Sequence, residues 1–363
     1  MAGEGAASGP RVMSADAPPG PPAIRDAERL CARIRAVHDA IRDQVVAACE
    51  ATPAERLAAV VAEEGGDTVF AIDRVSEAVL VERFADIARD WSCLLIAEGL
   101  GSDGRLVLPR ASDPAAVEVV VIVDPIDGTR GLMYQKRPAW ILTGVAAART
   151  PGGRAPRLSD IALAVQTEIP LVKQHLCDQL WAIAGQGARA ERLDRLSGVR
   201  APLSVRPSAA PTLTQGFGGV VRFFPGAREE LSAIDDAVAA ALLGPPRAGV
   251  AQMFEDQYIS TGGQLYELMV GHDRWIADLR PVVEQALRRR GLTLGICSHP
   301  YDMCTALIAR EVGVVLTDEH GGGVDAPLDV TSNVGWIGYA NTTLRDQIAP
   351  VLAGILRQRG LGL

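Results

Sequence analysis

The spacing of apolar residues along the chain changes between helical and extended periods. Between residues 24 and 50, apolar side chains recur at three- and four-residue steps, at Leu30, Ile34, Val37, Ile41 and Val45. This spacing predicts an amphipathic helix with one apolar face. Further along, residues 119–123 form a continuous apolar, β-branched run. Such a run is typical of a strand that is buried on both faces.

Other segments continue this alternation. Apolar runs predict strands at residues 91–97, 139–148, 161–167, 180–184, 219–223, 274–277, 314–316 and 336–339. Helical patterns predict helices at residues 53–62, 74–88, 229–243 and 302–312, another that Ser260 or Thr261 caps, and a last one from Leu344. Residues 101–114 are predicted to form a loop. The chain is therefore expected to have a mixed α/β fold.

Two stretches of biased composition divide the chain. Residues 1–24 are rich in Gly, Ala, Pro and Ser, which predicts a disordered tail. Proline density rises again near residues 200–211, and we place a boundary there. The prediction is an N-terminal subdomain at residues 25–205 and a C-terminal subdomain at residues 206–363.

Composition narrows the classes of function. The chain is 48% hydrophobic and 22% charged, and its net charge of −8 comes with no basic block that would suit a nucleic acid. It has no uncharged apolar run of about 18 residues, the length that spans a bilayer, and no apolar signal core. Its six cysteines form no CxxC pair, which predicts buried thiols. We therefore expect a cytoplasmic protein with neither a nucleic-acid nor a membrane partner.

The buried run at residues 119–123 leads directly into two carboxylates. Asp124 and Asp127 would point to opposite faces of a continuing strand, because side chains alternate with a period of two. Pro125 donates no hydrogen bond to a sheet, so we expect the chain to turn here and to bring both carboxylates to one cavity. Two close, buried carboxylates repel unless a positive group joins them. A hard divalent cation such as Mg²⁺, which takes oxygen ligands, fits this pair.

The residues after this pair suit a phosphate. Gly128 and Thr129 are expected to open a helix or turn, where backbone N–H groups can bind an anion. Arg130 follows closely and could steer an anionic substrate, although a solvated basic patch is the commoner explanation. The alternative for the whole segment is ordinary turn chemistry, because Asp, Pro and Gly are each favoured in turns.

The segment DPIDGT at residues 124–129 resembles the signature of the inositol monophosphatase-like family, the Mg²⁺-dependent, lithium-sensitive phosphomonoesterases. A second family motif, usually WDxAA, is matched by YDMCTA at residues 301–306, where Tyr301 replaces the tryptophan. With acidic positions upstream, the similarity covers most of the chain beyond the predicted tail. The resemblance implies a layered α-β-α-β-α sandwich, in which helices sandwich two sheets and the metals lie at the junction of the two halves.

The resemblance also implies a site with two or three Mg²⁺ ions. The implied ligands are Glu98, Asp124, Ile126 (through its carbonyl), Asp127 and Asp302. Asp124 would be shared by two ions, and Glu98 with Asp73 would border a third, looser site. The family pattern has two successive glutamates where this chain has Glu98 and then Gly99. That departure puts one contact to the loosest metal in doubt.

Two of these aspartates also have an ordinary structural interpretation. Asp73 and Asp302 each stand at the start of a predicted helix, where Asp is a good N-cap. For Asp73 the two roles are compatible. For Asp302 the N-cap would be the favoured explanation in isolation, and only the resemblance favours a metal ligand.

The roles in catalysis are likewise what the resemblance implies. The Thr129 hydroxyl, oriented by Asp73, would help to position and deprotonate the attacking water beside Glu98. The amides of Gly128 and Thr129 would hold the phosphate. No covalent intermediate with the enzyme is needed.

A small-residue segment is expected to bind the substrate's alcohol. Ser260, Thr261 and Gly262 match this part of the family pattern loosely, and the plain alternative is a helix cap. The first choice of substrate is a small phosphorylated metabolite like inositol monophosphate. Fructose 1,6-bisphosphate and 3′-phosphoadenosine-5′-phosphate are the alternatives within the enzyme class.

A different class of function also remains open. The chain could be a non-catalytic relative that binds a phosphorylated ligand or a partner protein. The presence of every matched ligand favours the enzyme. The family commonly forms dimers, so a homodimer is possible, although no feature of the sequence demonstrates one.

Overall fold

The computed structural model describes residues 20–57, 60–64, 67–70, 73–98, 100, 103–110, 113 and 116–361. Most of the predicted tail at residues 1–24 lies outside these ranges. Within them, no helix has both the length and the apolarity needed to cross a membrane. The six cysteines are all buried and unpaired, as predicted.

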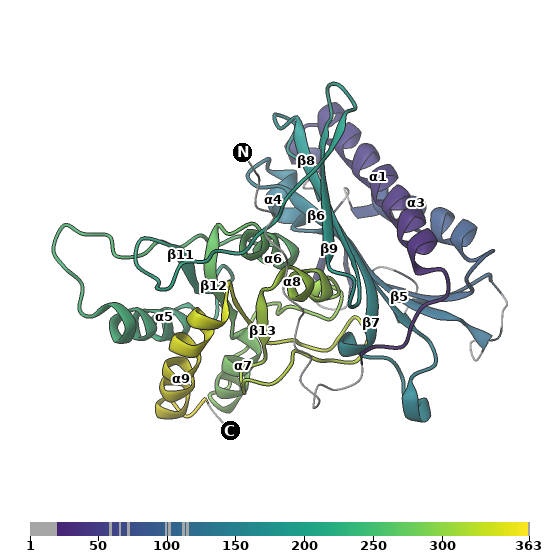
Figure 1. Cartoon of the computed structure of the whole chain (residues 1–363). Helices are drawn as coiled ribbons and strands as arrows, with labels where there is room; N and C mark the ends of the chain where they lie inside the picture. The colour runs from purple at the N-terminus through teal and green to yellow at the C-terminus, as the bar shows by residue number, and fades with distance from the viewer. Residues whose placement is uncertain are drawn as a thin grey trace, which may run out of the picture.

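The first sheet has eight strands in the order β10-β9-β8-β7-β6-β5-β3-β4 (Figure 1). Their bounds are β3 (Cys93–Ala97), β4 (Arg105–Leu108), β5 (Val119–Asp127), β6 (Ala139–Ala147), β7 (Ile161–Ile169), β8 (Leu176–Ile183), β9 (Ala188–Asp194) and β10 (Arg200–Pro202). Strands β3 and β5 are parallel, and the other neighbours are antiparallel. Every residue of β5 is buried, which confirms the prediction of a strand covered on both faces.

Helices α1 (Ala27–Ala51) and α3 (Asp73–Ile87) cover one face of this sheet (Figure 1). The five apolar positions that predicted α1 are each at most 4% exposed, so the predicted apolar face is the buried one. Burial of side chains of this size stabilises a fold by about 1.5–3 kcal/mol each. The apolar stripe of α1 therefore holds this layer together.

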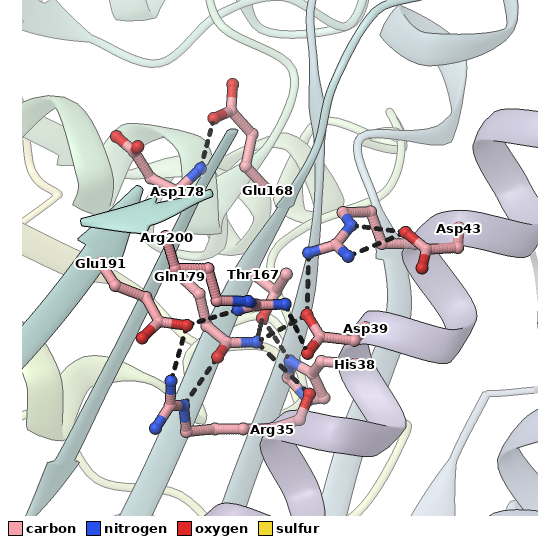
Figure 2. A network of polar contacts seen from close by, with 11 residues as sticks. Arg35, His38, Asp39, Asp43, Thr167, Glu168, Asp178, Gln179, Glu191 and Arg200 are labelled. Atoms are coloured by element: carbon pink, nitrogen blue, oxygen red, sulfur yellow. Dashed lines mark hydrogen bonds and ion pairs between the residues drawn. The ribbon is translucent and has the colours of Figure 1, made fainter. Parts of the chain in front are cut away.

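Polar contacts join α1 to the far strands of the same sheet (Figure 2). The side-chain carbonyl of Gln179 accepts a hydrogen bond from Arg35 at 2.7 Å, and its amide donates to Thr167 at 3.0 Å. The fully buried ring of His38 lies 2.9 Å from the Thr167 hydroxyl and 2.7 Å from the Thr143 hydroxyl. Burial lowers the pKa of His38 to about 3, so the imidazole is neutral and pairs with both hydroxyls.

The second sheet has four strands in the order β11-β12-β14-β13. Their bounds are β11 (Phe217–Val220), β12 (Asp273–Asp278), β13 (Val315–Thr317) and β14 (Trp336–Tyr339). Helices α5 (Arg228–Leu243), α7 (Arg280–Arg289) and α9 (Thr342–Gln358) pack on its outer face. The predicted boundary at residues 205 and 206 falls between β10 and β11, and it stays a prediction.

Helices α6 (Thr261–Met269) and α8 (Ala306–Val312) lie between the two sheets (Figure 1). Helix α6 contacts β6 of the first sheet and β12 of the second, and α8 contacts β7 and β13. Their apolar residues belong to one core with both sheets. The order of layers is therefore α-β-α-β-α, which confirms the expected architecture.

Several local predictions differ from the structure. The helix predicted at residues 53–62 is a short helix α2 (Ala54–Leu57) followed by strand β1 (Val60–Glu64). β1 pairs with β2 (Asp67–Phe70), and this pairing outweighs a helical pattern of such short length. The loop predicted at residues 101–114 contains β4, which extends the first sheet beside β3. Helix α7 was not predicted at all.

Gly144 on β6 lets the segment that follows Asp302 approach the first sheet closely. A Cβ atom at this position would lie 2.7 Å from the carbonyl oxygen of Cys304 and 2.7 Å from Cδ1 of Ile161. Both separations are shorter than ordinary van der Waals contact, and the first neighbour is backbone. The turn that carries Asp302 therefore rests directly on the strand, which only glycine permits.

We expect Gly144→Ala to lower the free energy of unfolding by about 1–3 kcal/mol, the usual range for overpacking. The matched control is Gly354→Ala in α9, where a Cβ atom would meet nothing within 4 Å. That variant should be as stable as the natural protein or more stable by about 1 kcal/mol, because Ala is the better helix former. Urea unfolding of the three proteins measures both. An unchanged Gly144→Ala variant would mean that the turn moves away freely.

Candidate functional site

The carboxyl end of β5 is irregular at the DPID segment. Asp124 pairs with Leu142 of β6, whereas Asp127 pairs with Trp140, so three steps along β5 oppose two along β6. This register shift is a β-bulge, and it alters the strict alternation of side chains. The prediction that Pro125 ends the strand was wrong, because β5 continues to Asp127. Both carboxylates nevertheless line one cavity, as the sequence predicted.

Asp302 joins this pair from the second half of the chain. One carboxylate oxygen from each of Asp124, Asp127 and Asp302 lies within 4.8 Å of the others, and we call these three residues the acid cluster. The prediction that Asp302 starts a helix was wrong, because α8 begins only at Ala306. The Asp302 carboxylate instead accepts a hydrogen bond from the backbone N–H of His299 at 2.5 Å, within the preceding turn.

Burial and mutual repulsion make the acid cluster electrostatically costly. Burial raises the pKa of Asp124 well above its usual range, and the carboxylates of Asp127, Asp302 and Glu98 raise it further. Burial, followed by the charge of Asp127, also raises the pKa of Asp302. Carboxylates that must be charged together in such a place need a cation. An all-oxygen donor set of this kind fits a hard divalent ion.

Asp127 is held by the start of α6. Its Oδ2 accepts hydrogen bonds from the Ser260 hydroxyl at 2.8 Å and from the Gly262 N–H at 2.6 Å. Burial raises the pKa of Asp127 to about 6, and these hydrogen bonds limit the rise. The Ser260 hydroxyl also accepts from the Gly263 N–H at 2.8 Å, which confirms Ser260 as the N-cap of α6. Ser260 and Gly262 thus act on Asp127 directly.

Gly128 and Thr129 open the helix α4 (Thr129–Met133), as predicted. Gly128 has φ of 96°, and a Cβ atom there would lie 3.1 Å from Cβ of Ser260. The position therefore needs glycine both for its left-handed backbone and for its close neighbour. The Thr129 hydroxyl donates to the carbonyl of Ile126 at 2.8 Å. All three residues line the cavity.

Glu98 reaches the acid cluster because of the strand order. β3 runs parallel to β5, with Ala97 paired to Val123, so the next residue of each strand emerges at the same edge. Glu98 lines the cavity there and is half-buried. Asp73 begins α3, and its side chain lies outside the part of the structure that is described. Its predicted role therefore stays a prediction.

A buried ion pair that no sequence pattern indicated lies beside the cavity, and its arginine helps to line that cavity. Asp278 is fully buried at the end of β12, and Arg280 contacts it through two nitrogens at 2.8 and 2.5 Å. Arg280 also donates to the carbonyl of Ile296 at 2.7 Å, and the Ser298 hydroxyl donates to Asp278 at 2.6 Å. The pair therefore anchors the segment that leads to Asp302. The two charged residues stand only two positions apart in sequence, but no local motif marks them as a buried pair.

The ring of Phe223 is another part of the cavity wall that no sequence pattern indicated. The Arg280 guanidinium lies 4.6 Å from its centroid, and Arg130 lies 5.4 Å from that of the neighbouring Phe224. All four residues line the cavity together with the acid cluster. The lining of the cavity thus combines acidic side chains with two arginines and two aromatic rings.

Comparison with known proteins gives a fold but no sequence match. No protein-family model matches the chain, and no curated protein matches its sequence. An inositol monophosphatase structure from Thermotoga maritima has a TM-score of 0.55 and 15% identity, covering 92% of this chain and all of that one. The extragenic suppressor protein suhB of Bartonella henselae has a TM-score of 0.60 and 15% identity, covering 89% and 98%.

A fructose-1,6-bisphosphatase from Leishmania major has a TM-score of 0.64 and 11% identity, covering 90% of this chain and 94% of that one. The similarity thus extends over nearly the whole of each protein. The chain has the fold of the inositol monophosphatase-like structures, a mixed α/β arrangement with two sheets. At such low identity, the likeness concerns the fold and leaves the reaction to be argued from the site.

Without a divalent cation, we expect the protein to become more stable as the pH falls from about 8 to 5. The folded-state pKa of Asp127 is about 6, above its unfolded value of about 3.9. The folded state therefore binds the proton more tightly, and this stability is lost as the pH rises through 6. Urea unfolding in chelator at both pH values measures it.

Asp127→Asn removes the titrating group, so its stability should depend less on pH than that of the natural protein. Glu168 is a buried group outside the cavity with a pKa raised to about 7 by burial, and it contributes with the same sign in both proteins. Equal pH dependence in the natural protein and the variant would contradict the assignment to Asp127.

Proposed function

We propose that this chain is a Mg²⁺-dependent phosphatase that hydrolyses a small phosphate monoester. The observation that carries the proposal is the acid cluster, in which two buried carboxylates and one half-buried carboxylate, from two halves of the chain, converge within 4.8 Å. Two of the structures with this fold are named as phosphatases, one an inositol monophosphatase and one a fructose-1,6-bisphosphatase. The acid cluster lies at the carboxyl end of β5, beside the proposed phosphate-binding residues Gly128 and Thr129.

The donor set supports a magnesium site. The proposed ligands are Glu98, Asp124, the carbonyl of Ile126, Asp127 and Asp302. Four of these five groups are carboxylates, and the fifth is a backbone oxygen, which is the ligand chemistry that Mg²⁺ prefers. When bound, such ions lower the pKa of water and offset negative charge on the phosphoryl and leaving oxygens.

The chain's own groups supply orientation. Because Oδ2 of Asp127 is held by Ser260 and Gly262, its Oδ1 is the oxygen that remains to face a cation. The Thr129 hydroxyl gives its proton to the carbonyl of Ile126, so we propose that its oxygen accepts a hydrogen bond from the attacking water. Glu98 and Asp73 complete the proposed catalytic set beside that water.

The proposed phosphate contacts are the backbone amides of Gly128 and Thr129 at the start of α4. The same two residues border the acid cluster, so a phosphate held there would lie beside the proposed cations. Arg130 lines this cavity as well and would add positive charge near the anion.

The proposed substrate is an inositol monophosphate or a similar sugar-alcohol phosphate. Fructose 1,6-bisphosphate and 3′-phosphoadenosine-5′-phosphate remain the alternatives. Ser260 and Gly262 would act on the substrate through Asp127, and Thr261, which lines the cavity beside Ser260, is placed to contact the alcohol. The Thr261 hydroxyl lies 3.2 Å from that of Ser298, which also faces the cavity.

Phosphate release from a panel of monoesters tests the proposal. The panel holds inositol 1-phosphate, fructose 1,6-bisphosphate, 3′-phosphoadenosine-5′-phosphate and histidinol phosphate, each with Mg²⁺ and with Mg²⁺ plus lithium. Release that requires Mg²⁺ and is inhibited by lithium would support the enzyme and name its substrate group. Mg²⁺ binding without release from any member would favour a non-catalytic phosphate-binding protein. Absence of Mg²⁺ binding would overturn the proposal.

We expect Asp124→Asn to lower turnover at least about a thousandfold, because the proposed shared ligand loses its charge. The fold should persist, since the substitution removes repulsion inside the acid cluster. The control is Asp346→Asn on the exposed side of α9, which should keep full activity. Steady-state kinetics at saturating Mg²⁺ compares the three. Substantial turnover by a metal-loaded Asp124→Asn variant would contradict the shared-ligand role.

A further inference from the structure

Gln166 on β7 is a polar side chain in the middle of an apolar core. It is fully buried, and its neighbours across the sheet are Leu142 on β6 and Leu180 on β8. Both leucines belong to the core that lies between the sheets. A buried amide costs about 1–3 kcal/mol for each unmet hydrogen bond, so its partners matter.

The two hydrogen bonds of the Gln166 side chain go to two different segments of the site. Its Nε2 donates to the carbonyl of Gly262 at 2.8 Å, and its Oε1 accepts from the hydroxyl of Thr305 at 2.9 Å. Gly262 in turn donates its N–H to Asp127 at 2.6 Å. Thr305 is fully buried and stands three residues after Asp302, in the same turn. One planar amide therefore connects the residue that holds the Asp127 carboxylate with the turn that carries Asp302.

The orientation of this amide is fixed by its partners. The Gly262 carbonyl can only accept a hydrogen bond, so the Gln166 amide must present its NH₂ group there. The Gln166 oxygen then faces Thr305, whose hydroxyl donates to it. A flipped amide would place two oxygens together and leave a buried donor without its acceptor. The bridge therefore has one arrangement.

Close packing against β6 also restricts the two segments that Gln166 connects. A Cβ atom on Gly262 would lie 2.6 Å from Leu142 and 3.0 Å from Oδ2 of Asp127, so the start of α6 sits against β6 without room to spare. On the other side, Cys304 rests on Gly144 of the same strand. The two segments can move apart only by leaving the sheet.

We propose that Gln166 is a positioning residue that sets the distance between the Asp127 and Asp302 carboxylates and thereby the affinity of the site for a divalent cation. The inference rests on the proposed function, because it assumes that these carboxylates bind the cation. Two ionised carboxylates repel and would drift apart in the empty site. The amide opposes that drift, so the cation finds its ligands already in place and loses less free energy in gathering them.

A purely structural role is the competing explanation, in which Gln166 only satisfies buried groups. The chain offers a matched control for it in Gln179 on β8. Gln179 is also buried, and its side chain bonds to Arg35 and Thr167 on the α1 side of the sheet, away from the cavity (Figure 2). Loss of either glutamine should destabilise the fold, but only Gln166 leads to the acid cluster.

The test compares Gln166→Met with Gln179→Met, because Met nearly preserves the volume and removes the hydrogen bonds. Mg²⁺ binding to chelator-treated protein is measured by calorimetry at pH 8 without substrate, and Tm is measured alongside. We expect both variants to melt earlier than the natural protein. We expect the dissociation constant for Mg²⁺ to rise about tenfold in Gln166→Met and to stay within about twofold in Gln179→Met.

A second pair of variants keeps the test decisive if Gln166→Met fails to fold. Thr305→Val removes the hydroxyl that donates to Gln166, and Thr305→Ser keeps it. Weaker Mg²⁺ binding in Thr305→Val, with recovery in Thr305→Ser, supports the bridge. Unchanged Mg²⁺ affinity in the folded variants, or equal weakening in Gln179→Met, overturns the positioning role and leaves the proposed function intact. Absence of Mg²⁺ binding in the natural protein overturns the proposed function, and the inference with it.

Discussion

Concentrated negative charge at the end of β5 is the constraint to which the neighbouring structure responds. Asp124 and Asp127 are each less than a tenth exposed, and Asp302 approaches them from a segment about 175 residues further along the chain. Folding this chain without a cation places like charges together in a poorly hydrated place, which opposes folding. The stability of the surrounding layers must offset that cost.

The layers around the acid cluster show how this is done. The first sheet is held by apolar packing from α1 and α3 on one side and from α6 and α8 on the other. Within this frame, the N–H groups at the start of α6 and the turn before α8 each hold one carboxylate. The buried pair of Arg280 and Asp278 secures the loop before Asp302 through hydrogen bonds with Ile296 and Ser298. Several helices and strands thus share in holding the mutually repelling carboxylates in place.

The sequence predicted those parts of the site that depend on local pattern. A β-branched run followed by two aspartates indicated a buried strand ending in a carboxylate pair, and Ser260 was recognisable as a helix cap. The order of layers was expected from the resemblance, and most strands were predicted from their apolar runs. Two predictions from local preference were wrong, namely that the strand ends at Pro125 and that a helix starts at Asp302. In both places tertiary contacts override the local preference.

The residues that the sequence could not indicate are those whose partners are distant. Neither Arg280 nor Gln166 belongs to a recognisable sequence motif. Folding brings Ser298 to Arg280, and it brings Gly262 and Thr305 to Gln166. The similar structures share 11–15% identity with this chain over about nine-tenths of its length. A fold shared at such low identity is specified by the packing of its layers.

The bulge in β5 has a consequence for how this site can change in evolution. Between Asp124 and Asp127 the ladder to β6 is interrupted. The carbonyl oxygen of Ile126 accepts a hydrogen bond from Thr129, and both residues line the cavity. A backbone oxygen is present whatever side chain the position carries. Substitutions at position 126 would therefore be limited only by how well the new side chain packs in the apolar core. Loss or gain of one residue would remove this oxygen from its place. At position 126, selection would therefore act on the length of the segment more than on the identity of the side chain.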